Sequence, residues 1–159
     1  MTFHIDANVP AQILGDPYRL EHVLGNLLSN AIKFSDLEAK IEIHVSYGSR
    51  VAGYVTFSVK DYGPGMSSEE QKMLFQPFRQ IRPGELQKGR GSGLSLSICK
   101  EIIQLHKGTI GCVSRLRSAA SCDINSTKEG GSEFFFNIEG LAVAENDEVV
   151  VDNFFCSIS

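Results

Sequence analysis

Several features are missing from this chain of 159 residues, and each absence argues against a class of function. No apolar run approaches the roughly 20 residues that a membrane-spanning helix needs. No block of lysine and arginine occurs, and the formal net charge is -4, so nothing indicates a nucleic-acid surface. The start of the chain lacks the charged and then apolar layout of a signal peptide. We therefore expect a cytoplasmic domain without contacts to nucleic acid or membrane, with any membrane attachment lying outside this chain.

The cysteines form no metal or redox motif. No two of them make a C-x-x-C pair, and no histidine stands beside them at zinc-finger spacing. Unpaired cysteines of cytosolic proteins are usually reduced thiols. We expect that state for Cys99, Cys112, Cys122 and Cys156.

The spacing of apolar residues predicts strands and helices in a mixed order. Strands are expected over 2–5, 41–46, 55–59, 109–114 and 132–138. Helices are expected over 17–34, 68–75 and 94–105. The last helix is expected to carry its apolar side chains on one side: Leu94, Ile98, Ile102 and Leu105. These elements sum to an α/β (α+β) two-layer sandwich, a mixed and mostly antiparallel sheet with three helices on one face.

Local signals support two of the helix starts and divide the chain. Asp16 can cap the first helix and Pro17 suits its first position. Ser67-Ser68-Glu69-Glu70 is a capping-box signature for the second. We expect one domain over 1–140, with a tail or linker over 141–159.

The first helix contains a polar pattern suited to a metal and a phosphate. Asn26 and Asn30 lie four residues apart, so both amides emerge from one helix face. An amide oxygen is a neutral, hard ligand for a Mg²⁺ ion that also holds phosphate oxygens. Lys33, nearly one turn on, adds a point charge for a phosphate. A polar stripe on an exposed helix is the alternative, and this motif alone favours it.

Two further motifs are short. Asp61-Tyr62-Gly63-Pro64-Gly65 ends a strand, and its glycines let the backbone come close to a flat ligand. Its carboxylate suits a hydrogen bond from an exocyclic amine such as that of adenine. A tight surface turn is the alternative. Phe75-Gln76-Pro77-Phe78 can hold the base of a loop against the core, although such a tetrapeptide more often serves packing.

The fourth motif is a glycine-rich turn that opens the third helix. In Gly89-Arg90-Gly91-Ser92-Gly93-Leu94-Ser95-Leu96, free backbone N–H groups and the helix start favour an anion. A flexible hinge is the alternative. The turn lacks the G-x-x-x-x-G-K-[ST] pattern of a P-loop and follows no strand, which argues against a P-loop and a dinucleotide fold.

In this order, the motifs resemble the boxes of the sensor histidine kinase catalytic domain. Residues 16–34 resemble the N box, 61–65 the G1 box, 75–78 the F box and 91–96 the G2 box. Gly131-Ser132-Glu133-Phe134 resembles the G3 box. The resemblance covers about residues 2–139. It implies the Bergerat ATP-binding fold shared with DNA gyrase, mismatch-repair ATPases and heat-shock chaperones, with ATP and Mg²⁺ as cofactors.

The resemblance also implies roles for single residues. Asn30 matches the Mg²⁺ ligand, Asn26 its neighbour near the phosphates, and Lys33 a phosphate contact, and these three form the implied catalytic set. Phe34 matches a ring position beside the adenine, and Asp61 matches the carboxylate that reads the adenine amine. The other implied nucleotide-binding residues are Gly63, Gly65, Met66, Phe75, Phe78, Lys88, Arg90, Gly91, Ser92, Gly93, Leu94 and Ser132.

A kinase is favoured over an ATPase at one position. ATPase relatives usually carry a glutamate four residues before the Mg²⁺-binding Asn, whereas this chain has Asn26, and an amide cannot act as a general base. The implied reaction is phosphoryl transfer from ATP to a histidine imidazole, which depends chiefly on positioning and charge neutralisation. The loop 76–93 looks like the family's ATP lid, with Arg79, Arg82, Lys88 and Arg90 as candidate phosphate contacts.

Departures from the family pattern leave a second interpretation open. Ser95 replaces the third glycine of the G2 box, Lys107 replaces a common glycine, and the loop 115–131 is longer than usual. A nucleotide-binding pseudokinase or regulatory module is therefore the alternative, followed by an ATPase.

The phospho-accepting histidine is not found in this chain. His4, His22, His44 and His106 lack the acidic residue and nearby proline of the family's acceptor helix. The implied partners are the kinase's own dimerisation and phospho-acceptor domain and a downstream response regulator or receiver domain. We expect the isolated domain to be a monomer that does not phosphorylate itself.

Overall fold

The computed structural model describes residues 1–10, 13, 15–35, 39–81, 93–117 and 130–140. Its elements follow in the order β1 (Thr2–Ile5), α1 (Pro17–Phe34), β2 (Glu42–Tyr47), β3 (Tyr54–Asp61), α2 (Ser68–Met73), α3 (Ser95–Leu105), β4 (Thr109–Arg115) and β5 (Gly131–Glu139). The predicted order of strands and helices is confirmed. The predicted tail over 141–159 lies outside the described residues, as does most of the loop 115–131.

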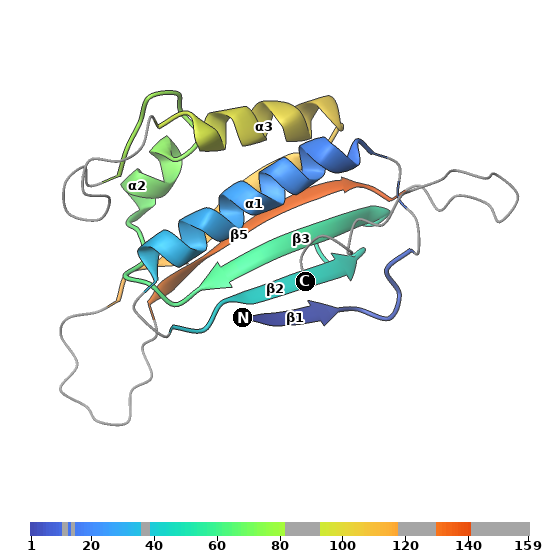
Figure 1. Cartoon of the computed structure of the whole chain (residues 1–159), viewed down its shortest axis with the longest axis horizontal. Coiled ribbons are helices and arrows are strands. Elements are labelled where there is room, and N and C mark those ends of the chain that lie inside the picture. Colours follow the sequence, from blue (N-terminus) through green and yellow to red (C-terminus); the bar gives the residue numbers. More distant parts are fainter. Residues whose placement is uncertain (11–12, 14, 36–38, 82–92, 118–129, 141–159) are drawn as a thin grey trace, which may run out of the picture.

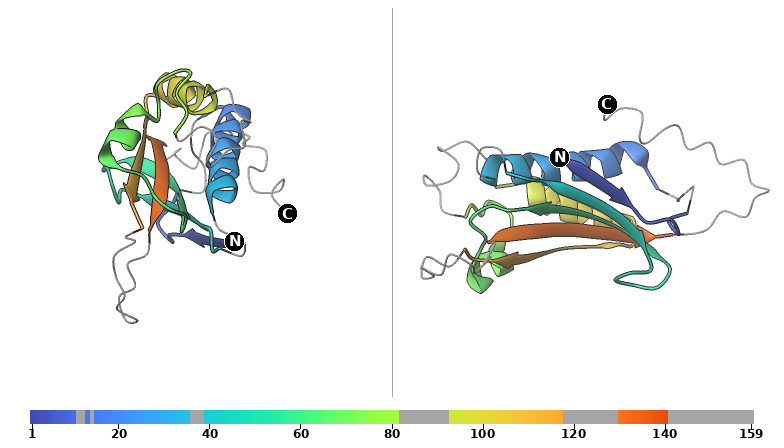
Figure 2. Two further views of the ribbon diagram at one scale, coloured as in Figure 1. Left: turned by 90° about the vertical axis from the view of Figure 1, so that its left-hand side faces the viewer. Right: turned by 90° about the horizontal axis from the view of Figure 1, so that it is seen from below.

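The strands form one mixed sheet in the order β1-β2-β3-β5-β4. β1 pairs in parallel with β2, and every other neighbouring pair is antiparallel. Helices α1 and α3 lie side by side over one face of this sheet (Figures 1 and 2). Helix α2 contacts β4 near the sheet margin. The predicted two-layer, mostly antiparallel architecture is therefore confirmed.

The capping residues Asp16 and Ser35 set the two ends of helix α1. The side chain of Asp16 accepts a hydrogen bond from the backbone N–H of Arg19 at 3.1 Å, and Pro17 occupies the first turn. The helix ends at Phe34 because Ser35 adopts an extended backbone with ψ 150°. Its buried face consists of Leu20, Val23, Leu24, Leu27 and Ala31. This face fixes which side chains of α1 remain available for a ligand.

The core lies between the sheet and the two long helices. Alternate residues of β3 and β5 point into it, and the rings of Phe57 and Phe136 stack with centroids 4.9 Å apart. Fully burying a side chain of this size contributes about 1.5–3 kcal/mol. The buried members on these strands are Val55, Phe57, Val59, Phe134, Phe136 and Ile138.

The predicted apolar side of α3 is only partly buried. Ile98 is 41% exposed and Leu105 is 85% exposed, whereas Ile102 is buried. The buried residues are Ser97, Cys99, Ile102 and Ile103. The helix is apolar on more than one side, so its contacts with α1 and the sheet decide which side is buried. In the described ranges, no helix combines the length and apolarity needed to cross a bilayer.

Helix α2 is short, and a reciprocal pair of hydrogen bonds between Ser67 and Glu70 caps its N-terminus. Glu70 N donates to Ser67 Oγ at 3.2 Å, and Ser67 N donates to Glu70 Oε2 at 2.8 Å. The predicted capping box is therefore confirmed. The helix ends at Met73, before the predicted Phe75.

The two long helices share two distinct ends. At one end, which we call the pocket end, α1 finishes, α3 begins, β3 finishes and β5 begins (Figure 1). At the other, the closed end, α1 begins and α3 finishes. There the Nε2 atom of His106 accepts a hydrogen bond from Asp16 N at 3.0 Å, and Nδ1 lies 2.8 Å from Ile102 O. Because a carbonyl only accepts, the neutral ring holds its proton on Nδ1.

Candidate functional site

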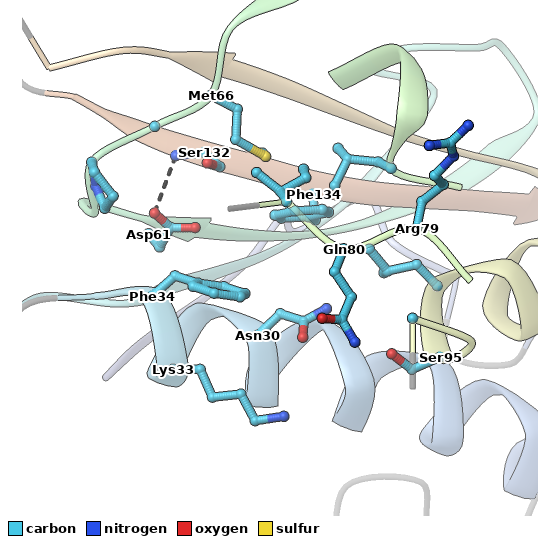
Figure 3. A pocket seen from close by; sticks show the side chains of 16 residues that line it. Asn30, Lys33, Phe34, Asp61, Met66, Arg79, Gln80, Ser95, Ser132 and Phe134 are labelled. Atoms are coloured by element: carbon cyan, nitrogen blue, oxygen red, sulfur yellow. Dashed lines mark hydrogen bonds between the residues drawn. The ribbon is translucent and has the colours of Figure 1, made fainter. Parts of the chain in front are cut away.

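A pocket opens at the pocket end between α1, the end of β3, the start of α3 and the segment after α2 (Figure 3). Strand β5 contributes Ser132 and Phe134 to its wall. The lining residues are Asn30, Lys33, Phe34, Asp61, Pro64, Gly65, Met66, Leu74, Arg79, Gln80, Ile81, Gly93, Ser95, Leu96, Ser132 and Phe134.

Asp61 is the buried charged group of this pocket. It is 3% exposed, and its Oδ1 atom accepts hydrogen bonds from Gly63 N at 2.9 Å and Ser132 N at 3.2 Å. Burial raises the pKa of Asp61, and these two backbone donors oppose the rise. Within the described part of the chain no hydrogen bond reaches Oδ2, and the carboxylate faces the pocket (Figure 3). Oδ2 can therefore accept a hydrogen bond from a donor placed in the pocket.

Helix α1 supplies the opposite wall. Asn30, Lys33 and Phe34 lie on its last turns and extend toward the pocket (Figure 3). Among the residues that the structure describes, no hydrogen bond or ion pair engages the side chain of Asn30 or Lys33. The phenyl ring of Phe34 lies between these two groups and Asp61. An apolar ring next to an amide and an ammonium suits a ligand with a flat apolar part and an anionic part.

The turn after β3 requires its glycines for close packing. A Cβ atom on Gly63 would collide with the carbonyl oxygen of Phe34, which would push the turn away from α1. Gly65 has φ +71°, and a Cβ atom there would collide with the carbonyl oxygen of Arg115. These two glycines therefore fix the turn between α1 and the end of β4.

The start of α3 accommodates Ser95 without backbone strain. Gly93 has φ +70°, and a Cβ atom there would lie 2.8 Å from Arg79 O. Ser95 is the first helical residue, and it is not among the non-glycine residues with positive φ. The backbone here therefore does not need a third glycine. Lys107, in contrast, has φ 56°, so the glycine that it replaces would suit that position.

The structure brings together part of the predicted site. Eight predicted residues line the pocket: Asn30, Lys33, Phe34, Asp61, Gly65, Met66, Gly93 and Ser132. Lys88, Arg90, Gly91 and Ser92 lie outside the described residues, as does the lid candidate Arg82. The other five predicted residues are described but do not line the pocket: Asn26, Gly63, Phe75, Phe78 and Leu94.

These five residues have identifiable surroundings. Asn26 lies one turn before Asn30, and its Nδ2 atom is buried without a hydrogen-bond partner in the described structure. Phe75 packs against the core. Phe78 is 75% exposed with φ 60°. Gly63 donates its backbone N–H to Asp61 Oδ1, and Leu94 is the N-cap residue of α3.

Sequence reasoning missed several lining residues. Arg79 was named only as a lid candidate. Four lining residues lie inside predicted boxes but were not named as binding residues: Pro64, Ser95, Leu96 and Phe134. No box covers Leu74, Gln80 or Ile81. Gln80 and Ile81 follow the predicted F box where no period is visible, so no signal singled them out. Phe134 alternates with polar neighbours on β5, and that alternation could have placed it on the helix-covered face.

Comparison with known proteins agrees with this geometry. The family described as histidine kinase-, DNA gyrase B- and HSP90-like ATPase matches residues 15–140. The chain belongs to this family. It is the ATP-binding catalytic domain of the sensor histidine kinase type, as its curated relatives indicate.

Two curated relatives illustrate the likeness. The sensor histidine kinase RcsC of Salmonella typhimurium is 42% identical over 107 residues, which covers 67% of this chain and 11% of that protein. The peroxide stress-activated histidine kinase mak1 of Schizosaccharomyces pombe is 33% identical over 121 residues, covering 72% of this chain and 7% of that protein. The chain thus spans about a tenth of the length of such relatives.

Solved structures give the same result for the fold. The catalytic domain of histidine kinase ThkA aligns with a TM-score of 0.66 and 29% identity, covering 87% of this chain and 77% of that chain. Full-length ShkA in complex with AMPPNP aligns with a TM-score of 0.68 and 26% identity, covering 90% of this chain and 26% of that chain. This domain therefore corresponds to about three quarters of the ThkA chain and to about a quarter of ShkA.

Proposed function

We propose that this domain binds Mg-ATP in the described pocket and donates the γ-phosphoryl group to a histidine on a separate dimerisation domain. The observation that carries the proposal is the state of Asp61. Its Oδ1 atom is held by two backbone donors, while Oδ2 faces the pocket without a hydrogen bond from the described residues. The exocyclic amine of adenine is a donor of the required kind.

The adenine side of the site combines this carboxylate with apolar surface. Phe34, Met66 and Phe134 line the pocket next to Asp61. A flat base buries its faces against such side chains while one edge donates to the carboxylate. Ser132 stands at the same edge and contributes both its amide to Asp61 and its side chain to the pocket wall.

The phosphate side is formed by the end of α1. Lys33 presents an ammonium group, and Asn30 presents an amide oxygen of the type that Mg²⁺ accepts together with phosphate oxygens and waters. The residues therefore fit a magnesium ion held by Asn30 and the nucleotide. Such an ion supplies neutralisation of the phosphate charge. Lys33 adds a fixed positive charge, and Gly93 brings the backbone of the α3 turn to the same side.

The proposed chemistry is an in-line displacement. A nitrogen of the acceptor imidazole attacks the γ-phosphorus, a P–N bond forms, and the bond to the oxygen bridging the β- and γ-phosphorus breaks. ADP carries away the electron pair of that bond. This chain contributes positioning and charge, because phosphoryl transfer needs little covalent help from protein side chains.

The local structure argues against the two alternatives. In place of the glutamate of ATPase relatives stands Asn26, an amide that cannot accept a proton from water near neutral pH. Among the departures that left the pseudokinase alternative open, Ser95 has an ordinary helical backbone, and Lys107 does not line the pocket. We therefore favour a transferase. We further propose a cytoplasmic, monomeric domain whose partners are the acceptor domain and a receiver or response regulator.

Calorimetric titration of a Mg-ATP analogue tests the binding step. Asp61→Asn should lower the affinity about 10- to 100-fold, because it removes a charge-assisted hydrogen bond of about 1.5–3 kcal/mol. The matched control is Asp6→Asn, which changes an exposed aspartate between β1 and α1 and should bind as the wild type does. Equal affinity in all three proteins would contradict the proposed site.

Two further measurements separate metal binding and transfer. Asn30→Ala should lose the part of the affinity that depends on magnesium and keep the part measured in a chelator. Incubation with ATP and a separately supplied acceptor domain should label that domain and release little free phosphate. Steady phosphate release by this chain alone would support the ATPase instead.

A further inference from the structure

The side chain of Gln71 on α2 pairs with the edge of the sheet as a neighbouring strand would. Its Nε2 atom donates to Ser114 O at 3.0 Å, and its Oε1 atom accepts from Ser114 N at 3.2 Å. β4 is an edge strand, so Ser114 has backbone groups that no further strand can engage. A primary amide presents a donor and an acceptor side by side, and Gln71 therefore satisfies both groups at once.

The same amide also holds the turn that follows Asp61. Gln71 Nε2 donates to Met66 O at 3.1 Å, and Met66 N donates to Ser114 Oγ at 2.8 Å. Both backbone groups of Met66 are thus engaged by residues of α2 and β4. Met66 itself lines the pocket. Gln71 consequently fixes one wall of the pocket without touching its interior.

A relay of hydrogen bonds continues from this point to the buried carboxylate. Ser114 Oγ lies 2.9 Å from Ser132 Oγ and also donates to Gly131 O at 2.9 Å. Ser132 N then donates to Asp61 Oδ1 at 3.2 Å. The position of the Ser132 amide therefore depends on β4 as well as on pairing between β3 and β5.

We propose that Gln71 is a positioning residue for base recognition, acting through Ser114 and Ser132 to orient Asp61 toward an adenine amine. The inference rests on the proposed nucleotide function. Gln71 is not among the pocket-lining residues, so its influence on a ligand passes through the residues that it holds. Its removal should weaken adenine recognition more than general nucleotide binding.

A purely structural role makes a different prediction. If Gln71 only satisfied the exposed edge of β4, its loss would lower stability and leave the preference for adenine unchanged. Guanine carries a carbonyl where adenine carries its exocyclic amine, so the affinity ratio of ATP to GTP reports the orientation of Asp61. That ratio is insensitive to a loss of folded protein, because both nucleotides sample the same folded fraction.

The experiment compares Gln71→Met with Gln104→Met in the full chain. Methionine keeps the length of the side chain and removes its donor and acceptor. Gln104 is an exposed glutamine of α3 at the other end of the helix layer. Affinities for ATP and GTP are measured by calorimetry, and the folded fraction by thermal unfolding. For Gln71→Met we expect ATP affinity about tenfold weaker, or about 1.4 kcal/mol, with GTP affinity nearly unchanged. Gln104→Met should match the wild type.

Ser114→Ala provides a second variant in case Gln71→Met does not fold. It removes the hydroxyl relay and keeps the backbone groups of β4, so the ATP to GTP ratio should fall in the same direction. In the double variant, the change in the ATP to GTP affinity ratio should be smaller than the sum of the two single changes, because both residues act on one network. An unchanged ratio in folded Gln71→Met, or in Ser114→Ala if the former does not fold, would overturn the inference. Absence of ATP binding by the wild type would overturn the proposed function and this inference with it.

Discussion

The pocket end and the closed end of the helix layer differ in how the polar side chains nearest the helices are hydrogen-bonded. At the closed end, His106 uses both ring nitrogens, and Asn137 Oδ1 accepts from both Thr109 N and Thr109 Oγ1 at 2.9 Å. At the pocket end, Asp61 Oδ2 and the side chains of Asn30 and Lys33 have no partner among the described residues. Both ends are formed by the same two helices and the same sheet.

The difference separates stability from binding. At the closed end, His106 links the start of α1 to the end of α3, and Asn137 links β5 to β4. At the pocket end, the unsatisfied groups are available to bind a ligand. Proteins commonly retain such destabilising groups where function needs them. Changes at the closed end should therefore move stability with little effect on the affinity of folded molecules, and changes at the pocket end should do the reverse.

The largest stability effect is expected for Gly108→Ala at the closed end. A Cβ atom there would collide with the carbonyl oxygen of Asn137 and approach Ile103 Cγ2 to 3.0 Å. Overpacking of this kind typically costs about 1–3 kcal/mol, and the backbone contact places Gly108 near the upper end. Urea unfolding measures the loss. Gly25→Ala is the matched control, because nothing lies within 4 Å of its added Cβ atom and a helical position favours alanine.

A smaller loss of stability is expected when the hydrogen bonds that His106 makes between α1 and α3 are removed. His106→Ala deletes the acceptor for Asp16 N and the donor to Ile102 O. Two such hydrogen bonds contribute about 1–2 kcal/mol in total. The matched variant His22→Ala, on an exposed position of α1, should leave stability nearly unchanged. If His106→Ala changed ATP affinity as strongly as stability, the two ends would be coupled, and the closed end would not serve stability alone.

Lys107→Gly should increase the stability of the domain. Lys107 has φ 56°, a left-handed conformation that costs a side-chain-bearing residue roughly 1–2 kcal/mol. Part of that gain is offset by the entropy of glycine in the unfolded chain, so we expect about 0.5–1 kcal/mol of added stability. Lys100→Gly, inside α3, should instead destabilise by about 1 kcal/mol. Chemical unfolding of the pair checks whether backbone conformation decides the sign.

The smallest stability effect is expected for Asp61→Asn at the pocket end. Because the pKa of Asp61 is raised in the folded protein, its ionised form is unfavourable there relative to the unfolded chain. The asparagine variant should be more stable than the wild type at high pH. This advantage should shrink as pH falls through the folded-state pKa, where the native carboxyl takes up its proton. Unfolding curves across this range, with Asp6→Asn as control, test the direction.

The buried faces of α1 and β3 and the main residues of the pocket could be predicted from the sequence. The 3.6-residue period of α1 and the alternation in β3 specify their buried faces, because each element has one clearly apolar side. The order of boxes placed Asn30, Lys33 and Asp61 in one site. These are local patterns in which the residue type itself carries the signal.

Other features could not be predicted because they depend on tertiary contacts. Helix α3 has apolar residues on several sides, so its sequence does not show that Ile98 and Leu105 are exposed while Cys99 and Ile103 are buried. A glutamine on a short polar helix is ordinarily exposed, so nothing indicated that Gln71 pairs with β4. The hydrogen bond between Asp16 and His106 joins residues 90 positions apart in the sequence, and only the packing of the helices brings them together.

The unsatisfied groups of the pocket have a consequence for the abundance of the protein. A ligand that binds only the folded state stabilises it by about 2.7 kcal/mol when its concentration is 100 times the Kd. Nucleotide would supply partners for Asp61, Asn30 and Lys33 that the chain itself does not provide. On the proposed function, the energy charge of the cell would set both the phosphorylation state of the partner and the lifetime of this domain against proteolysis.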